Sequence, residues 1–232
     1  MTLFGQKFKH VLVLGFSLFL AACASAPQQT VALNSNILAK SDIKIGFVYI
    51  APEENATTHI YGAGCLLCYG VASSLTSKLD THLEANISTD ELDNIKNLVI
   101  AQYAEKAPIT EVTLPMPIDK LKKFKGELGY AGKDFSVLKQ TMGLDVLVVL
   151  QLYRHGAYRS FSSYVPNGDP QGYVAGTLFA IDLDTNAYVQ YLEIDEKVQP
   201  AGEWDEPVAF PSVTTAYYQA IENVKAKLKE AI

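Results

Sequence analysis

The sequence predicts an α/β (α+β) fold in one domain, built on a mixed β-sheet of about five strands flanked by helices. The continuously apolar run 144–153 is typical of a strand that is buried on both faces. Apolar residues recur at helical spacing in 71–83 and again in 213–228, which predicts two helices with one apolar face each. In chain order the expected elements are β-α-α-β-α-β-β-β-α, and this mixture predicts a sheet with helices packed against it.

The first half of the domain contains two expected strands and two expected helices. Residues 43–50 are rich in β-branched and aromatic side chains, which favours a strand, whereas 51–64 contains Pro52 and is expected to be a loop. A capping box at 88–91 marks the start of the second helix, and 109–114 alternates as a strand does. The expected apolar faces of the two helices are Val71, Leu75, Leu79 and Leu83, followed by Leu92, Ile95, Val99 and Tyr103.

The second half of the domain contains three expected strands and two expected helices. A short helix is expected over 134–141, ahead of the buried strand. Residues 173–183 and 188–198 read as two strands joined by a tight turn, and 199–211 reads as a loop. The last helix, 213–228, carries an apolar face that is expected to pack on the sheet.

The N-terminus has the features of a bacterial lipoprotein signal peptide. Lys7 and Lys9 precede the apolar run 11–22, and Cys23 follows the small residues Leu-Ala-Ala directly. An apolar run of 12 residues is too short to cross about 30 Å of hydrocarbon as a helix. The stretch Leu-Ala-Ala-Cys resembles the lipobox of bacterial lipoproteins, and this resemblance implies cleavage after residue 22 and lipidation, including palmitate, on Cys23.

Removal of the signal peptide leaves 17 basic and 25 acidic side chains, a net charge of −8. That balance argues against nucleic acid as a partner and against electrostatic attraction to anionic lipid. The membrane partner is therefore expected to be engaged through the N-terminal acyl chains. Ala24 fits delivery to the outer membrane, on its periplasmic face, with 23–41 as a lipidated tether and 42–232 as a single periplasmic domain.

Cys65 and Cys68 are expected to form a disulfide, because they are close in sequence and lie in an oxidising compartment. Two other interpretations stay open for this C-x-x-C pair. A thiolate ahead of a helix can serve redox chemistry, and cysteines can ligate zinc. The apolar pair between the cysteines argues against redox chemistry, and no second paired ligand set accompanies them, so we expect no metal and no cofactor.

Aromatic and arginine side chains in the segment 153–173, together with the single tryptophan, suggest a partner surface. If 166–170 forms a loop tip, the neighbouring side chains flank it as a contact patch. The alternative is that these residues simply cover the sheet. The candidate partner-contact residues are Tyr158, Arg159, Phe161, Tyr164 and Trp204.

Several segments resemble a superfamily of periplasmic lipoproteins. They are 134–138 (DFSVL), 142–145 (MGLD), the hairpin 176–186, Trp204 and the final amphipathic helix. The superfamily includes the curli-export channel lipoprotein, the Pel polysaccharide lipoprotein and the lipoprotein activators of penicillin-binding proteins. The resemblance implies an envelope protein that assembles with copies of itself or with an envelope protein partner. The chain offers no extra segment for a membrane-spanning hairpin, so a pore is not expected.

The strings 64–69 (GCLLCY) and 202–207 (GEWDEP) resemble a group of uncharacterised proteobacterial lipoproteins. No G-x-S-x-G, phosphate-binding loop or H-E-x-x-H motif occurs, and two serine–lysine pairs lack the partner motifs of acylases. We expect a non-enzymatic accessory or assembly subunit of a cell-envelope or secretion system. The alternatives are a periplasmic thiol–disulfide protein that uses Cys65 and Cys68, and a module that binds peptidoglycan or a polysaccharide.

Overall fold

The computed structural model describes residues 27–207 and 209–232, and within them it confirms the mixed α/β fold. Seven strands form one mixed sheet in the order β3-β1-β4-β6-β7, with β2 and β5 also paired to β4. The helices are α2 (Ser35–Leu38), α3 (Leu66–Asn86), α4 (Asp90–Ala104), α5 (Ser136–Met142) and α6 (Pro211–Ala231). The strands are β1 (Ile45–Ile50), β2 (Thr57–Tyr61), β3 (Ile109–Glu111), β4 (Val146–Ser162), β5 (Val165–Pro166), β6 (Gln171–Asp182) and β7 (Tyr188–Val198).

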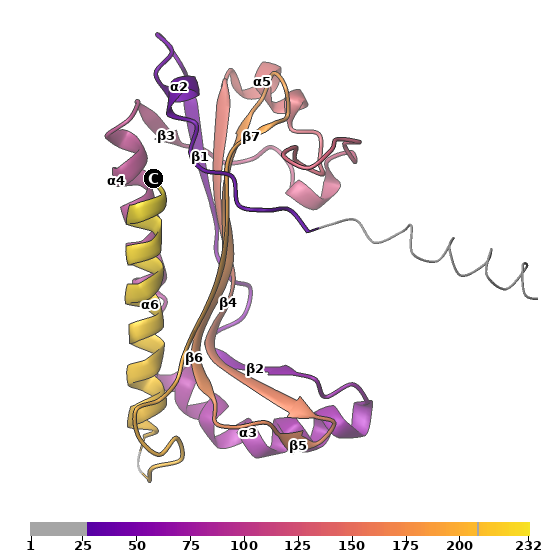
Figure 1. The fold of residues 1–232 in the computed structure, drawn as a ribbon, viewed down its shortest axis with the longest axis vertical. Helices are drawn as coiled ribbons and strands as arrows, with labels where there is room; N and C mark the ends of the chain where they lie inside the picture. The colour runs from indigo at the N-terminus through magenta and orange to yellow at the C-terminus, as the bar shows by residue number, and fades with distance from the viewer. Residues whose placement is uncertain (1–26, 208) are drawn as a thin grey trace, which may run out of the picture.

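The upper part of the sheet has a hydrophobic core on each face. Helices α4 and α6 cover one face, and α5 with the chain that precedes it covers the other (Figure 1). Side chains of β4 alternate between the two cores, with Val148 in the first and Val149 in the second. This arrangement explains why the sequence of β4 is continuously apolar there, since neither face meets water.

Strand β4 is long enough to pair with two consecutive strands along one edge. Its first part pairs in parallel with β1, from Ile45 opposite Val146 onwards, and its last part pairs in parallel with β2, from Thr57 opposite Gly156 onwards. On its other edge β4 pairs with β6 in antiparallel fashion over nearly its whole length. One strand therefore holds the two ends of the sheet together.

The sheet bends sharply in the middle of β4. The pairing with β6 shifts register between Leu152 and Arg154, and Gly156 follows at φ +117°. A Cβ on Gly156 would lie 2.5 Å from the backbone oxygen of Thr57, so only glycine lets β2 approach at this point. Beyond the bend, β2, the N-terminal half of α3, the end of β4 and β5 project from the body as a foot (Figure 1).

Three boundaries differ from those expected from the sequence. β2 lies within the segment 51–64 that was expected to be a loop, and β4 runs to Ser162 rather than ending at residue 153. The expected tether 23–41 also belongs in part to the domain, because Val31 pairs with Tyr191 and Leu38 is buried in the core. The packed domain thus begins near Val31 and not at residue 42.

The apolar face of α3 differs from the expected one. Leu79 and Leu83 are buried, as expected, but Val71 and Leu75 are 39% and 48% exposed. Apolar residues at strict four-residue spacing drift by about 40° per step around an α-helix, since four residues make 400°. The stripe therefore faces the core at its C-terminal end and has turned away from it towards the N-terminus of the helix.

Replacement of Gly156 by alanine tests the bend. Gly168 makes a matched control, because it has a similar φ of +120° and no atom within 4 Å of an added Cβ. We expect Gly168→Ala to lower the free energy of unfolding by about 1 kcal/mol, the cost of the left-handed backbone. Gly156→Ala should lower the free energy of unfolding by at least about 3 kcal/mol, because the clash with Thr57 adds to the cost of the backbone conformation. Urea unfolding measures both, and equal losses would contradict this account of the bend.

Candidate functional site

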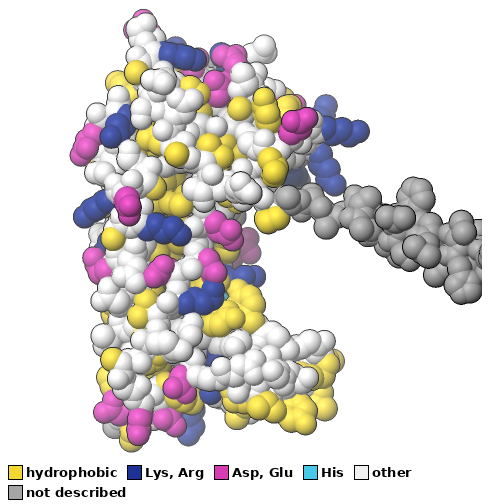
Figure 2. Space-filling model, viewed as in Figure 1, with side chains coloured by type: hydrophobic (Ala, Val, Ile, Leu, Met, Phe, Trp, Pro, Cys, Tyr) yellow, Lys and Arg dark blue, Asp and Glu magenta, His cyan; other side chains and the backbone are white. Residues whose placement is uncertain are grey.

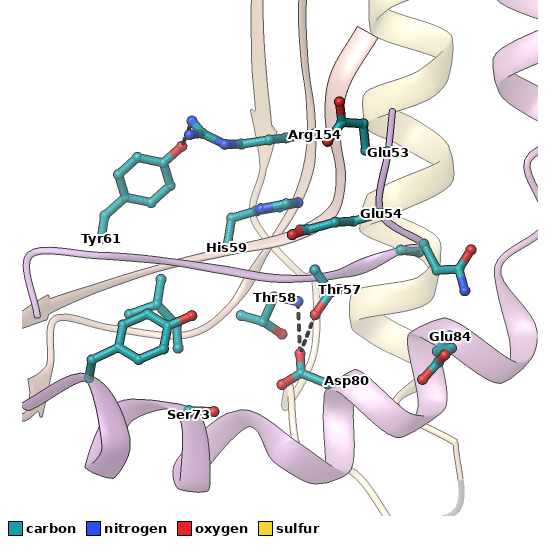
Figure 3. A pocket seen from close by; sticks show the side chains of 14 residues that line it. Glu53, Glu54, Thr57, Thr58, His59, Tyr61, Ser73, Asp80, Glu84 and Arg154 are labelled. Atoms are coloured by element: carbon teal, nitrogen blue, oxygen red, sulfur yellow. Dashed lines mark hydrogen bonds between the residues drawn. The ribbon is translucent and has the colours of Figure 1, made fainter. Parts of the chain in front are cut away.

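Asp80 of α3 fixes the helix to β2 and so gives the foot its shape. Its carboxylate accepts hydrogen bonds from the Thr58 backbone N–H at 2.7 Å and from Thr57 Oγ1 at 3.3 Å (Figure 3). It also accepts one from Thr76 Oγ1 at 3.0 Å. Hydrogen bonds to a charged acceptor are stronger than neutral ones. The sequence analysis did not single out Asp80, because its partners on β2 lie more than 20 residues away in the chain.

A polar pocket of about 780 Å³ opens between β2, α3 and the bend in β4. Figure 3 shows that its side chains come from four parts of the chain: the loop ahead of β2, β2 itself, one face of α3, and β4, which contributes Arg154. Glu53, Glu54 and Glu84 give it acidic character. The pocket can hold a polar or cationic group, but Asp80 and His59 already bond to the protein's own backbone.

Two histidines lie at the bend. His155 is 1% exposed, its Nδ1 lies 3.2 Å from the Tyr217 hydroxyl, and its Nε2 has no hydrogen-bond partner among the described residues. Burial, with a smaller contribution from the nearby His59, lowers the pKa of His155 to about 4. The Nε2 of His59 lies 3.1 Å from the backbone oxygen of His155, and burial lowers the pKa of His59 as well. Both rings are therefore held in the neutral form near pH 7.

Aromatic and cationic side chains gather on the inner side of the bend. Tyr61, Tyr158 and Tyr173 pack with ring centroids 4.7 to 6.5 Å apart. Lys197 lies over the rings of Tyr158 and Tyr173, and Arg154 donates a hydrogen bond to the Tyr61 hydroxyl at 2.6 Å. These cation–π contacts join β2, β4, β6 and β7 where the sheet turns.

The structure separates the five candidate partner-contact residues instead of collecting them in one patch. The segment that carries them is strand up to Ser162, so successive side chains point to opposite faces. Arg159 and Phe161 are buried together, with the guanidinium 4.5 Å from the Trp204 ring, and this corrects the expectation that they lie in an exposed loop. Tyr158 packs against Tyr173 on the inner side of the bend. Tyr164 is 61% exposed at the turn before β5.

Cys65 and Cys68 form a disulfide at the tip of the foot. Cys65 is the N-cap of α3 and its Sγ accepts a hydrogen bond from the Cys68 backbone N–H at 3.0 Å. Leu66 and Leu67, between the two cysteines, are 90% and 79% exposed. The apolar pair between the two cysteines therefore faces solvent at the tip.

Apolar side chains are exposed along the foot beyond this tip. Val71 and Leu75 of α3, Tyr164 before β5 and Val165 at the start of β5 are between 39% and 61% exposed. Figure 2 shows hydrophobic side chains along the underside and tip of the foot, whereas charged side chains are spread over the body. We call Val71, Leu75, Tyr164 and Val165 the foot surface. Exposed apolar side chains that gather in this way are a candidate interaction site.

The predicted lipidation site Cys23 lies outside the described residues. Within the part of the chain that the structure describes, no group of three or more His, Cys, Asp or Glu side chains is placed to hold a metal ion. None of the helices between residues 27 and 232 is both long and apolar enough to cross a membrane.

Comparison with known proteins finds distant structural likenesses only. No family model and no curated protein sequence matches the chain. A PelC dodecamer from Paraburkholderia phytofirmans is 10% identical, with a TM-score of 0.27 over 83% of this chain and 92% of that one. The hypothetical protein CT253 from Chlamydia trachomatis is 7% identical, with a TM-score of 0.31 over 82% and 97%. Lipoprotein GNA1162 from Neisseria meningitidis is 9% identical, with a TM-score of 0.30 over 77% and 99%.

The buried histidine predicts a loss of stability at acidic pH. Below pH 6.5 the unfolded chain binds a proton on His155, whereas the folded chain does so only near pH 4. The free energy of unfolding should therefore be highest above pH 6.5 and fall by about 3 kcal/mol as the pH is lowered to 4. Urea unfolding across this range measures the fall, and His155→Gln should flatten it to the smaller part due to His59. An unchanged slope in the variant would contradict this assignment.

Proposed function

We propose that this protein is a non-enzymatic, lipid-anchored accessory or assembly subunit of a cell-envelope or secretion system. It is held by Cys23 on the periplasmic face of the outer membrane, and it binds a second copy of itself or an envelope protein partner through the foot surface. The observation that carries the proposal is the projecting foot, whose apolar side chains have no partner in the described chain.

The N-terminal sequence supports the location. The basic residues, the apolar run and Leu-Ala-Ala-Cys at positions 20–23 are the pattern of a lipoprotein signal, and Ala24 follows the cysteine. Several acyl chains on one residue hold a protein to a membrane far more firmly than one chain does. A subunit anchored in this way meets its partners at the membrane.

The physical chemistry of the foot supports binding. Val71 and Leu75 lie on α3 one turn apart, so they present a continuous apolar stripe rather than scattered apolar side chains. The foot is also fixed, because Asp80 bonds α3 to β2 and β2 pairs along β4. A rigid apolar surface loses little conformational freedom on binding, which favours affinity. Asp80 and His59 of the neighbouring pocket already bond to the protein's own backbone, which favours a structural role for these two side chains.

Replacement of Cys23 tests the anchor. The Cys23→Ser chain should remain an unprocessed precursor without acyl chains and should be lost from the outer-membrane fraction, because the thiol that receives the lipid is absent. Intact mass and membrane fractionation measure both effects. Cys65→Ser is the matched control and should be processed and lipidated normally. Normal processing and outer-membrane location of Cys23→Ser would overturn the anchor.

Photo-crosslinking from single positions in cells tests the foot surface. A crosslinking side chain at Val71 or Leu75 should give a defined adduct whose mass identifies a second copy or another envelope protein. Tyr218 on α6 is the matched control, because it is as exposed as Val71, at 39%, but lies away from the foot. Leu75→Ser should reduce the adduct formed from Val71 several-fold. A strict monomer with no adduct specific to the foot positions would contradict the proposal.

A further inference from the structure

The described chain begins against a basic loop on the side of the sheet that α4 and α6 do not cover. The side-chain oxygen of Gln28 accepts a hydrogen bond from the Gly129 backbone N–H at 3.0 Å, and Val31 then pairs with Tyr191 at the edge of the sheet. Gly129 belongs to the loop 119–130, which we call the basic loop. Residue 27, where the described chain starts, therefore lies within a few residues of this loop.

The basic loop reverses the charge of the molecule locally. It carries Lys120, Lys122, Lys123 and Lys125 against two acidic residues, in a chain with an overall acidic excess. Within the described residues none of the last three lysines has a carboxylate within 4 Å, and all three are exposed. Figure 2 shows a group of basic side chains at the edge of the molecule next to the start of the described chain. Net charge alone, which predicted no attraction to anionic lipid, misses this patch.

The loop is held in place by bonds that leave its lysines free to face outwards. Lys133 donates hydrogen bonds to the backbone oxygens of Asp119 and Leu121, and the Asn186 side chain bonds to the backbone of Ala131 and Lys133. Lys133 and the buried Asn186 therefore fix the position of the loop. A fixed loop presents its charges at a constant position relative to the sheet.

The tip of the foot points to the same side as the basic loop. Figure 1 shows that the start of α3, the lobe that contains α5 and the start of the described chain all lie on the side of the sheet opposite α6. The tip carries Leu66 and Leu67, the two most exposed large apolar side chains among the described residues. Cations and exposed leucines on one side are the combination that binds a phospholipid surface, since cations meet headgroups and leucines enter the acyl boundary.

We propose that this side of the molecule lies on the phospholipid surface, with the basic loop against anionic headgroups and Leu66–Leu67 inserted beside them. The inference rests on the proposed lipidation of Cys23. Three residues lie between Cys23 and the first described residue, so the chain between them spans at most about 14 Å when fully extended. An anchor of that reach brings the basic loop close to the bilayer. The foot surface, on α3 and beside β5, stays available for a protein partner.

Hydrogen exchange on the lipidated full-length protein tests this orientation. The protein is reconstituted in vesicles of phosphatidylcholine with phosphatidylglycerol, or of phosphatidylcholine alone, and intact mass first confirms the acyl chains. We expect backbone amides in 119–130 and 62–68 to exchange about tenfold more slowly in the anionic vesicles than in the neutral ones, because each lysine near an anionic surface strengthens the contact several-fold. Added salt should reduce this protection.

Substitutions test whether the basic loop and Leu66–Leu67 are the residues that contact the phospholipid surface. Replacing Lys122, Lys123 and Lys125 with glutamine should remove the protection in 119–130, and Leu66→Ser with Leu67→Ser should remove it in 62–68. The control replaces Lys106, Lys227 and Lys229, which lie at the end of α4 and on α6, and should leave both segments protected. Equal exchange in the two kinds of vesicle, or equal loss with the control, would overturn the inference. Absence of acyl chains would instead refute the anchor, and absence of adducts from Val71 would refute the foot surface.

Discussion

The pairing of β4 with β1 and then with β2 is the interaction on which the rest of the structure depends. The two parallel registers differ, since Ile50 lies opposite Gln151 and Thr57 opposite Gly156. Six residues on the edge chain therefore face only four on β4, and the excess forms the loop of Pro52 to Ala56. This mismatch, together with the register shift against β6 after Leu152, leaves the sheet continuous but turned. The body and the foot are one sheet with a bend, so the foot projects without a hinge of irregular chain.

The bend places polar groups in the interior, and their arrangement explains why they are tolerated. A buried imidazole costs least when it is neutral, and burial holds His155 in that form against the Tyr217 hydroxyl. A carboxylate needs donors, and Asp80 receives three from β2 and α3. Thr58 Oγ1 and His155 Nε2 are the buried side-chain atoms without a partner in the described chain. Both lie at the junction, where the turn of the sheet leaves the fewest choices of partner.

The sequence was sufficient to predict the elements whose patterns are local. The apolar run of β4, the hairpin of β6 and β7, and α4 and α6 all follow from periodicity within a single segment. β2 was missed because Pro52 and Gly62 bracket a strand of only five residues, although Thr-Thr-His-Ile-Tyr has the composition of a strand. The extension of β4 was missed because Gly156 interrupts its apolar pattern, and only its contact with Thr57 shows why glycine is there. The site depends on these missed elements, since Asp80 has no evident role until β2 is placed beside α3.

The partner-contact residues show where local reasoning fails and what replaces it. Aromatic and arginine residues close together in sequence suggested one patch. Because side chains alternate along a strand, Arg159 and Phe161 are buried on one face of the sheet and Tyr158 lies on the other. Trp204 covers Arg159, and its indole ring stacks on the ring of Phe210. The exposed apolar area lies instead on α3, where the four-residue stripe turns away from the core. A stripe that leaves the core within one helix is a sequence signal in its own right, because a helix needed only for packing would keep its apolar residues on the buried face.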